Sequence, residues 1–280
     1  IKKIKTAAGQ DAEPQEGDLV RVTSNKGDFL GTGHYQNGSI AVRILSFQDV
    51  GIDEDFWTKR IKEAYELRQQ IHLTDNKSTN IYRLIHAEGD GLPGLILDYY
   101  AGTVVVQSHS IGMHYAKDII VKAIKNVYGD KLKAIFDKSE GTLPKTGPVQ
   151  VEDHYIYQSE DFTSVGLEHG CKFKIDWEKG QKTGFFIDQR DNRALLASYS
   201  KGKKVLNTFC YTGGFSIAAL NNGAEHVDSV DASARAIDLT NENVELNGFV
   251  NKHGSHAIDT FKFFEQNDCS QYDVIVLDPP

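Results

Sequence analysis

The chain has 280 residues, a formal net charge of −8 and 40% hydrophobic residues, which is ordinary for a globular protein of two or three domains. The acidic balance does not point to a nucleic-acid-binding protein, so an RNA partner would require basic patches built by folding. No apolar run is long enough to span a bilayer and no signal peptide is visible, so we predict a cytoplasmic protein without a membrane partner.

The cysteines also indicate a reducing compartment. Cys171, Cys210 and Cys269 lie far apart, and no pair has the spacing of metal ligands. An odd number of cysteines argues against a disulfide framework. We therefore predict reduced cysteines and no metal site.

The first 50 residues have the pattern of a small β domain. After a polar start at residues 1–16, short apolar runs alternate with turn sequences, and Asn37-Gly38 before the run at 39–45 is a strong hairpin signal. The side chains expected on one face of that run are Ile40, Val42 and Ile44. We predict a β-barrel or meander over residues 1–50. Many such barrels bind RNA, but a generic β module fits the pattern equally well.

Residues 51–180 are predicted to form a connector helix and a central α/β domain. Acidic residues at 53–55 suit the first turn of a helix. Its apolar stripe consists of Trp57, Ile61, Ala64 or Tyr65, and Ile71. The elements expected next are strands at 81–85, 95–97, 103–106, 132–136 and 171–175 and a helix at 115–128. Residues 138–170 are polar and turn-rich, which indicates a long excursion.

Residues 181–280 alternate regularly between strand and helix patterns. The expected strands are 205–209, 226–231 and 272–278, and the expected helices are 215–221, 234–246 and 261–264. This alternation is typical of a parallel, doubly wound sheet. The predicted fold class is therefore α/β, with a Rossmann-like domain preceded by a small β-barrel and a central α+β domain.

The junction between the first strand and the first helix of this sheet reads TFCYTGGF over residues 208–215. Its glycines permit a tight turn and close approach of the backbone to a ligand, and the helix that follows offers free N–H groups. The dinucleotide fingerprint G-x-G-x-x-G is absent. The pattern therefore favours a ligand without a pyrophosphate, such as S-adenosylmethionine.

Carboxylates follow the predicted strands at the edge where such sheets bind ligands. Asp231 is placed to accept hydrogen bonds from a ribose diol, with a helix cap that includes Ser233 as the alternative. Asp259 is placed for an adenine amino group, again with a helix cap as the alternative. Asp278 precedes two prolines, which form a rigid, donor-poor loop where the substrate would lie beside the methyl donor.

A dense polar set lies just upstream of the sheet. It follows Phe186 and consists of Asp188, Gln189, Arg190, Asn192 and Arg193. A helix cap with surface charges is the alternative interpretation. Its position next to a ligand-binding strand nevertheless makes it a candidate for binding.

These segments together resemble a known family. VLNTFCYTGGFSIAAL, SVDAS and VLDPP, which begin at residues 205, 229 and 276, are similar to motifs I, II and IV of class I S-adenosylmethionine-dependent methyltransferases. QKTGFFIDQRDNR at 181–193 and RLIHAEGDGLPGLILDYY at 83–100 resemble the ribosomal large-subunit RNA methyltransferase I family, which makes 5-methylcytosine in ribosomal RNA. The resemblance covers most of the chain.

This resemblance implies a domain order and a set of site residues. It implies a PUA domain at 1–50, a central domain at 51–180 and an S-adenosylmethionine-binding domain at 181–280. The residues that would contact the cofactor are Gln189, Phe209, Tyr211, Thr212, Gly213, Phe215, Asp231, Ser233, Asp259 and Asp278. Those that would contact the entering base are Phe186, Arg190 and Arg193. Asp278 would border the methyl group and is the catalytic candidate. The implied partner is ribosomal RNA, and homodimer formation is left open.

Methylation of cytosine at C5 requires a thiolate that adds to C6 of the base. The resemblance places that cysteine beyond residue 280, and family chains also begin earlier, so we expect a fragment. Cys210 follows the first strand and is expected to face the cofactor or the core. Two alternatives stay open: a methyltransferase acting on an exocyclic base nitrogen, and a non-catalytic RNA-binding module that retains S-adenosylmethionine.

The resemblance also predicts a basic groove between the β-barrel and the sheet, despite the net acidity of the chain. Its candidate residues are Lys2, Lys3, Lys5, Arg21, Arg43, Lys182, Arg190 and Arg193.

Overall fold

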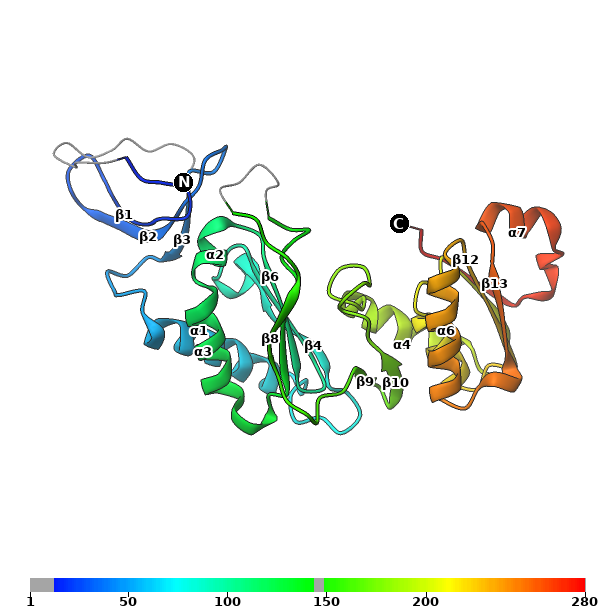
Figure 1. The fold of residues 1–280 in the computed structure, drawn as a ribbon. Helices are drawn as coiled ribbons and strands as arrows, with labels where there is room; N and C mark the ends of the chain where they lie inside the picture. The colour runs from blue at the N-terminus through cyan, green and yellow to red at the C-terminus, as the bar shows by residue number, and fades with distance from the viewer. Residues whose placement is uncertain (1–12, 144–148, 280) are drawn as a thin grey trace. The chain divides into compact units, whose positions relative to one another are not determined.

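The computed structural model describes residues 13–143 and 149–279. The chain divides into two compact units (Figure 1). The first unit contains the residues up to 75 and residues 82–163, and the second contains residues 76–81 and those from 164 onward. Most of the predicted polar start at 1–16, including Lys2, Lys3 and Lys5, lies outside the described residues.

The first unit begins with a three-stranded antiparallel sheet in the order β1-β2-β3. Its strands are β1 (Leu19–Thr23), β2 (Phe29–Tyr35) and β3 (Val42–Ser46). A bulge between Thr32 and Gly33 shifts the pairing of β2 with β3 by one residue. The clean alternation predicted for residues 39–45 is wrong, because β3 begins only at Val42, Ile44 is only partly buried, and both Leu45 and Ser46 are buried beside the bulge. Val42 is buried, but Ile40 precedes the strand and is exposed.

The rest of the first unit is a five-stranded mixed sheet in the order β4-β5-β6-β7-β8. Its strands are β4 (Ile81–His86), β5 (Leu95–Tyr100), β6 (Thr103–Ser108), β7 (Ala134–Asp137) and β8 (His154–Gln158). Its helices are α1 (Glu54–Gln70), α2 (Ile111–Tyr115) and α3 (Lys117–Tyr128), with single turns η1 (Ala87–Asp90) and η2 (Gly129–Lys131). Helices α2 and α3 connect the parallel strands β6 and β7. Strand β8 lies in the segment predicted as an excursion, and its half-exposed side chains gave no apolar pattern.

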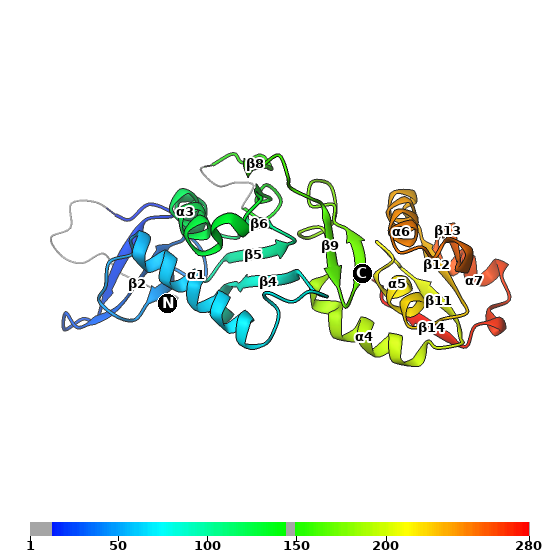
Figure 2. The same ribbon diagram turned by 90° about the horizontal axis from the view of Figure 1, so that it is seen from below.

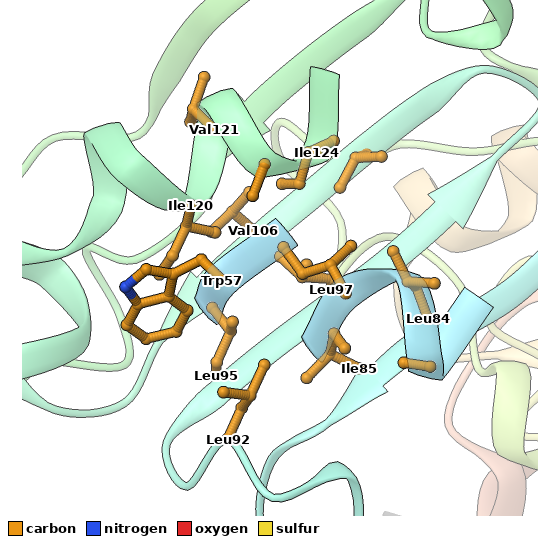
Figure 3. Packing of buried hydrophobic residues seen from close by; sticks show 14 of the residues in the cluster. Trp57, Leu84, Ile85, Leu92, Leu95, Leu97, Val106, Ile120, Val121 and Ile124 are labelled. Carbon is orange, nitrogen blue, oxygen red and sulfur yellow. The ribbon is translucent and has the colours of Figure 1, made fainter. Parts of the chain in front are cut away.

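The core of the first unit forms where α1 and α3 pack on one face of this sheet (Figure 3). Trp57 of α1 and Ile120 and Ile124 of α3 cluster there with Leu97 of β5, and each is at most 1% exposed. Burying side chains of this size contributes about 1.5–3 kcal/mol each relative to exposure. The apolar stripe predicted for the connector helix therefore does join it to the central sheet.

The two ends of α1 show one prediction confirmed and one wrong. Asp53 caps the helix by accepting a hydrogen bond from the N–H of Phe56 at 3.1 Å, as its acidic start predicts. Ile71, predicted as the last member of the inward stripe, instead ends the helix and is 56% exposed. Arg68 takes the inward position, where its ion pair with Asp90 satisfies the buried charge.

The second unit contains a four-stranded parallel sheet in the order β13-β12-β11-β14 (Figure 2). Its strands are β11 (Lys204–Thr208), β12 (His226–Asp231), β13 (His253–Ala257) and β14 (Val274–Leu277). Its helices are α4 (Arg190–Tyr199), α5 (Gly214–Asn221), α6 (Ala234–Leu246) and α7 (Thr260–Gln266), with single turns η3 (Ile187–Gln189), η4 (Val250–Lys252) and η5 (Cys269–Gln271). Because β12 and β14 flank β11, the strand order reverses beside β11, and sheets of this kind bind ligands at such a reversal.

Both faces of this sheet are partly covered by helices. On one face, Val205 and Val227 cluster with Ala219 of α5. On the other, Leu206 and Val230 of the sheet cluster with Phe263 of α7. The predicted parallel, doubly wound arrangement is confirmed. Within residues 13–143 and 149–279, no helix has the length and apolar character needed to cross a bilayer.

A β-hairpin also belongs to the second unit. It consists of β9 (Val165–Glu168) and β10 (Cys171–Lys174). Backbone N–H groups of Lys172 and Lys174 donate to the side chains of Asn247, which follows α6, and Asn243 at 2.9 and 2.7 Å. The predicted domain boundary at 180 separates residues 165–174 from the parallel sheet, whereas these hydrogen bonds join them to α6, a helix of that sheet.

Candidate functional site

The turn between β11 and α5 has an unusual backbone. Phe209 and Tyr211 have φ angles of 54° and 48°, in the left-handed region that residues with a side chain rarely adopt. Gly213 has a φ of 75°, and a Cβ there would lie 2.7 Å from Cγ2 of Thr240. A non-glycine residue held in this way costs roughly 1–3 kcal/mol, and such strain is concentrated at binding sites.

This turn opens onto a cavity of about 620 Å³ at the carboxyl edge of the parallel sheet. The cavity is lined by a residue from the carboxyl end of each strand: Phe209 after β11, Asp231 at the end of β12, Asp259 after β13 and Asp278 after β14. The volume is in the range of sites for small molecules and cofactors. The predicted site residues that line it are Phe186, Gln189, Arg193, Phe209, Tyr211, Thr212, Phe215, Asp231, Ser233, Asp259 and Asp278. Gly213 and Arg190 are not among the lining residues.

The carboxylate of Asp231 is held by two backbone donors. Its Oδ2 accepts from the N–H of Tyr211 at 3.0 Å, and its Oδ1 accepts from the N–H of Ser233 at 2.9 Å. Each carboxylate oxygen has a further lone pair, so two hydroxyl donors can still be accommodated. The hydroxyl of Ser233 caps α6 by accepting from the N–H of Ala236 at 3.3 Å. The cap is thus made by Ser233, while Asp231 anchors the strained turn.

The ends of β13 and β14 supply two further carboxylates. Asp259 caps α7 through the N–H of Lys262 at 3.1 Å. The adjacent Thr260 lines the cavity and is 2% exposed, and its hydroxyl has no hydrogen-bond partner among the described residues. Asp278 is exposed and accepts from Nε2 of Gln189 at 3.3 Å. This contact joins the end of β14 to the segment that precedes α4.

The segment before α4 is fastened to the glycine turn through Tyr211. The hydroxyl of Tyr211 accepts from the N–H of Gln181 at 2.8 Å, and its ring meets Phe186 edge to face at 5.3 Å. Burial raises the pKa of Tyr211. The ammonium of Lys182 lies 4.1 Å from the centre of the Phe186 ring and 3.5 Å from a carboxylate oxygen of Asp188. These contacts place an aromatic wall and a cation beside the turn.

Arg190 and Arg193 are both directed to a buried carboxylate. Arg193 is 3% exposed and donates to the two oxygens of Glu168 at 2.6 and 2.8 Å, and to the carbonyl of Phe186 at 2.9 Å. Arg190 lies 3.4 Å from the same carboxylate and donates to the carbonyl of Ile81. The family resemblance implied contact of both arginines with the entering base, whereas the structure brings both guanidinium groups to Glu168. That partner was missed because residues 138–170 showed no regular pattern.

The cysteines do not present a thiolate to the cavity. Cys210 lines it but is only 6% exposed, and its Sγ lies 3.7 Å from Oγ1 of Thr240. Burial raises the pKa of Cys210 to about 12 and that of Cys171 to about 11. Desolvation also raises the pKa of Cys269, which lies in η5. A nucleophilic cysteine needs the opposite shift, toward the thiolate.

The remaining residues predicted for a basic groove have partners within the first unit. Arg21 forms an ion pair with Asp49 at 2.6 Å, and Arg43 forms one with Glu88 at 3.3 Å. Within the described ranges, no group of three or more His, Cys, Asp or Glu side chains is arranged to hold a metal ion.

Comparisons with known proteins agree with this geometry. A family model for S-adenosylmethionine-dependent methyltransferases matches residues 158–280, and a PUA-like domain model matches residues 2–47. The fold and the site therefore define a class I S-adenosylmethionine-dependent methyltransferase that carries a PUA-like domain on its amino-terminal side. The predicted fold class and cofactor are confirmed.

The relatives are more specific. Ribosomal RNA large subunit methyltransferase I of Aeromonas hydrophila is 38% identical over 274 residues, which is 95% of this chain and 68% of that protein. The protein of the same name from Alteromonas mediterranea is 40% identical over 277 residues, 94% of this chain and 67% of that protein. The chain belongs to the ribosomal RNA large subunit methyltransferase I family, as the resemblance predicted.

Solved structures share the fold over nearly the whole chain. A structure described as a SAM-dependent methyltransferase from Streptococcus mutans has a TM-score of 0.80 and 27% identity, covering 96% of this chain and 70% of its own. A second methyltransferase, complexed with SAH, also has a TM-score of 0.80 and 27% identity, covering 95% and 68%.

The residues of the cavity fit S-adenosylmethionine. Asp231 keeps one acceptor position on each oxygen for a ribose diol. The unpartnered hydroxyl of Thr260 is a polar atom of the kind that a ligand satisfies. At Gly213, a Cβ would force the turn away from its present path. The donors and acceptors of the lining are therefore those that an adenosine-bearing ligand requires.

Proposed function

We propose that the protein methylates ribosomal RNA of the large subunit, at C5 of a cytosine. The observation that carries the RNA substrate is the identity of 38–40% over nearly the whole chain with relatives of that name. The PUA-like match over residues 2–47 supports it, because many such domains bind RNA. The C5 position rests on the resemblance of the segments at 83–100 and 181–193 to the family that makes 5-methylcytosine.

The proposed roles follow the order of the strands. Asp231 receives the ribose diol and Asp259 the adenine amino group, because they end neighbouring strands. Phe209, Tyr211, Thr212, Gly213, Phe215, Ser233 and Gln189 complete the cofactor site. Asp278 borders the methyl group, and Phe186 faces the entering base. Bound S-adenosylmethionine supplies an electrophilic methyl carbon on its sulfonium sulfur. The chain contributes alignment of that carbon with the acceptor and exclusion of water.

Carbon C5 of cytosine needs activation before it can accept a methyl group. A cysteine thiolate adds to C6, and the electrons of the C5–C6 double bond then make C5 nucleophilic. After methylation, a base removes the C5 proton and the thiolate leaves as the double bond forms again. The raised pKa values of Cys171, Cys210 and Cys269 disfavour all three for this role. We therefore assign the nucleophile to none of these three cysteines.

The proposal is tested by methyl transfer from labelled S-adenosylmethionine to large-subunit ribosomal RNA, with the full-length protein and with its Asp231→Ala variant. We expect label in 5-methylcytidine after digestion to nucleosides, and about 100-fold less transfer by the variant at a cofactor concentration well below saturation. Label in a nucleoside methylated on an exocyclic nitrogen would replace the C5 assignment. Binding of cofactor without transfer would favour the non-catalytic module instead.

A further inference from the structure

The strand-end carboxylates that line the cavity lack ion-pair partners in the described part of the chain, whereas the arginines that line it are already paired. Asp231, Asp259 and Asp278 form no ion pair with Lys or Arg among residues 13–143 and 149–279. Arg193 is occupied by Glu168, and Arg235 by Asp176. S-adenosylmethionine carries a carboxylate on its amino-acid tail, which needs a cation. The lysines of the lining, Lys179 and Lys182, are the cations left to consider.

Lys182 is the better placed of these two lysines. Its ammonium rests on the Phe186 ring at 4.1 Å, and its contact with Asp188 is a loose one of 3.5 Å between groups that are about half and two-thirds exposed. An exposed pair of this kind contributes little and can exchange for a ligand carboxylate. The side chain of Lys179 has no described partner that would direct it into the cavity.

The backbone around Lys182 is arranged for this position. Lys182 has a φ of 47°, in the left-handed region that a lysine rarely adopts. The preceding Gln181 donates its N–H to the hydroxyl of Tyr211, and the ring of Tyr211 meets Phe186. Two contacts of Tyr211 thus fasten the lysine beside the turn after β11. A lysine whose strained backbone is held by such contacts is a candidate for binding a ligand, rather than a surface lysine that contacts only water.

The direction of the cofactor places its tail at the same turn. With the ribose at Asp231 and the adenine toward Asp259, the rest of the molecule extends away from β13, toward β11 and β14. Gln189 in the same segment as Lys182 already contacts Asp278 at the end of β14. We propose that Lys182, supported by Phe186, binds the carboxylate of the amino-acid tail of S-adenosylmethionine. This inference rests on the cofactor assignment and adds the residue that recognises its tail.

Calorimetric titration with two ligands tests the assignment. S-adenosylmethionine and its decarboxylated form differ only in the carboxylate. We expect Lys182→Met to weaken S-adenosylmethionine binding by about fivefold, the upper end for one partly exposed charged contact, and to leave binding of the decarboxylated ligand within about twofold. Lys182→Arg should restore most of the difference. Lys172→Met, which removes a lysine of β10 outside the cavity, is the matched control.

Several results would overturn the assignment. Equal weakening of both ligands would show that Lys182 only positions the segment, and no weakening of either would assign it to RNA or to solvent. A selective loss in Lys179→Met instead would move the subsite to that lysine. Thermal unfolding of each variant without ligand shows whether the second unit still folds. Selective loss in Lys182→Met together with no methyl transfer to ribosomal RNA by the wild type would refute the proposed substrate and leave this subsite standing.

Discussion

Replacement of Asp231 by alanine gives the sharpest test of the cofactor site. Each of its oxygens accepts one backbone N–H, at 3.0 Å from Tyr211 and 2.9 Å from Ser233, and keeps one lone pair for a ribose hydroxyl. Two hydrogen bonds to a charged acceptor contribute about 1.5 kcal/mol each at the lower end of their range. Their loss, about 3 kcal/mol, corresponds to a dissociation constant about 100-fold higher.

The measurement is calorimetric titration of S-adenosylmethionine into the wild type and Asp231→Ala. The matched control is Asp238→Ala, which removes an exposed carboxylate from α6 outside the cavity and should leave the affinity unchanged. A ligand without the 2′-hydroxyl should lose affinity in the wild type but little more in Asp231→Ala, because the two changes remove one shared contact. Unchanged affinity in Asp231→Ala, or full additivity of the two changes, would refute the ribose assignment.

Two further predictions concern stability in the second unit. Gly213→Ala should lower the free energy of unfolding by about 2 kcal/mol, because its Cβ would meet Thr240. The control Gly170→Ala, at a glycine with a similar φ and open space around it, should lower it by only about 1 kcal/mol. Equal losses for the two variants in urea unfolding would refute the clash with Thr240 as a cause. Burial lowers the pKa of His253 to about 4 from the ordinary 6.5. The neutral imidazole therefore contributes at most about 3 kcal/mol to the free energy of unfolding; this contribution is full above pH 6.5 and is lost as the pH falls through 4. The free energies of unfolding of the wild type and His253→Gln should therefore converge on acidification. Parallel pH profiles of the two proteins would contradict this prediction.

The parallel sheet was predictable because its strands and helices carry their signals locally. The predicted bounds 226–231 and 234–246 coincide with β12 and α6, since a strand with Val227 and Val230 in the core, a capping serine and an amphipathic helix follow one another directly. Strand β8 was missed because its side chains are only partly buried, and β9 was missed because the residues that it buries are Gly166 and Glu168, which give no apolar pattern. Periodicity reports burial, so strands with little burial remain invisible to it.

The residues of the site also fall into those that local sequence signals predict and those that they do not. The strand-end carboxylates were predictable, because parallel strands bring their carboxyl ends to one edge. The surroundings of Arg193 were not predictable, because its partner Glu168 lies 25 residues earlier in a segment without periodic signal. The polar cluster at the start of α4 therefore contains one side of a buried ion pair, Arg193 with Glu168. Charge in a sequence shows that a partner is needed, but not whether the partner is RNA or another part of the chain.

Tyr211 links the parts of the site that the cofactor would touch. Its N–H donates to Asp231, its hydroxyl accepts from Gln181, and its ring supports Phe186 beneath the ammonium of Lys182. Its own backbone is left-handed, which is unfavourable without these contacts. The proposed ribose acceptor, Asp231, and the proposed tail cation, Lys182, are thus both linked to one residue with a strained backbone. A ligand that engages both ends adds contacts to a turn that already holds its conformation, so little ordering is required on binding.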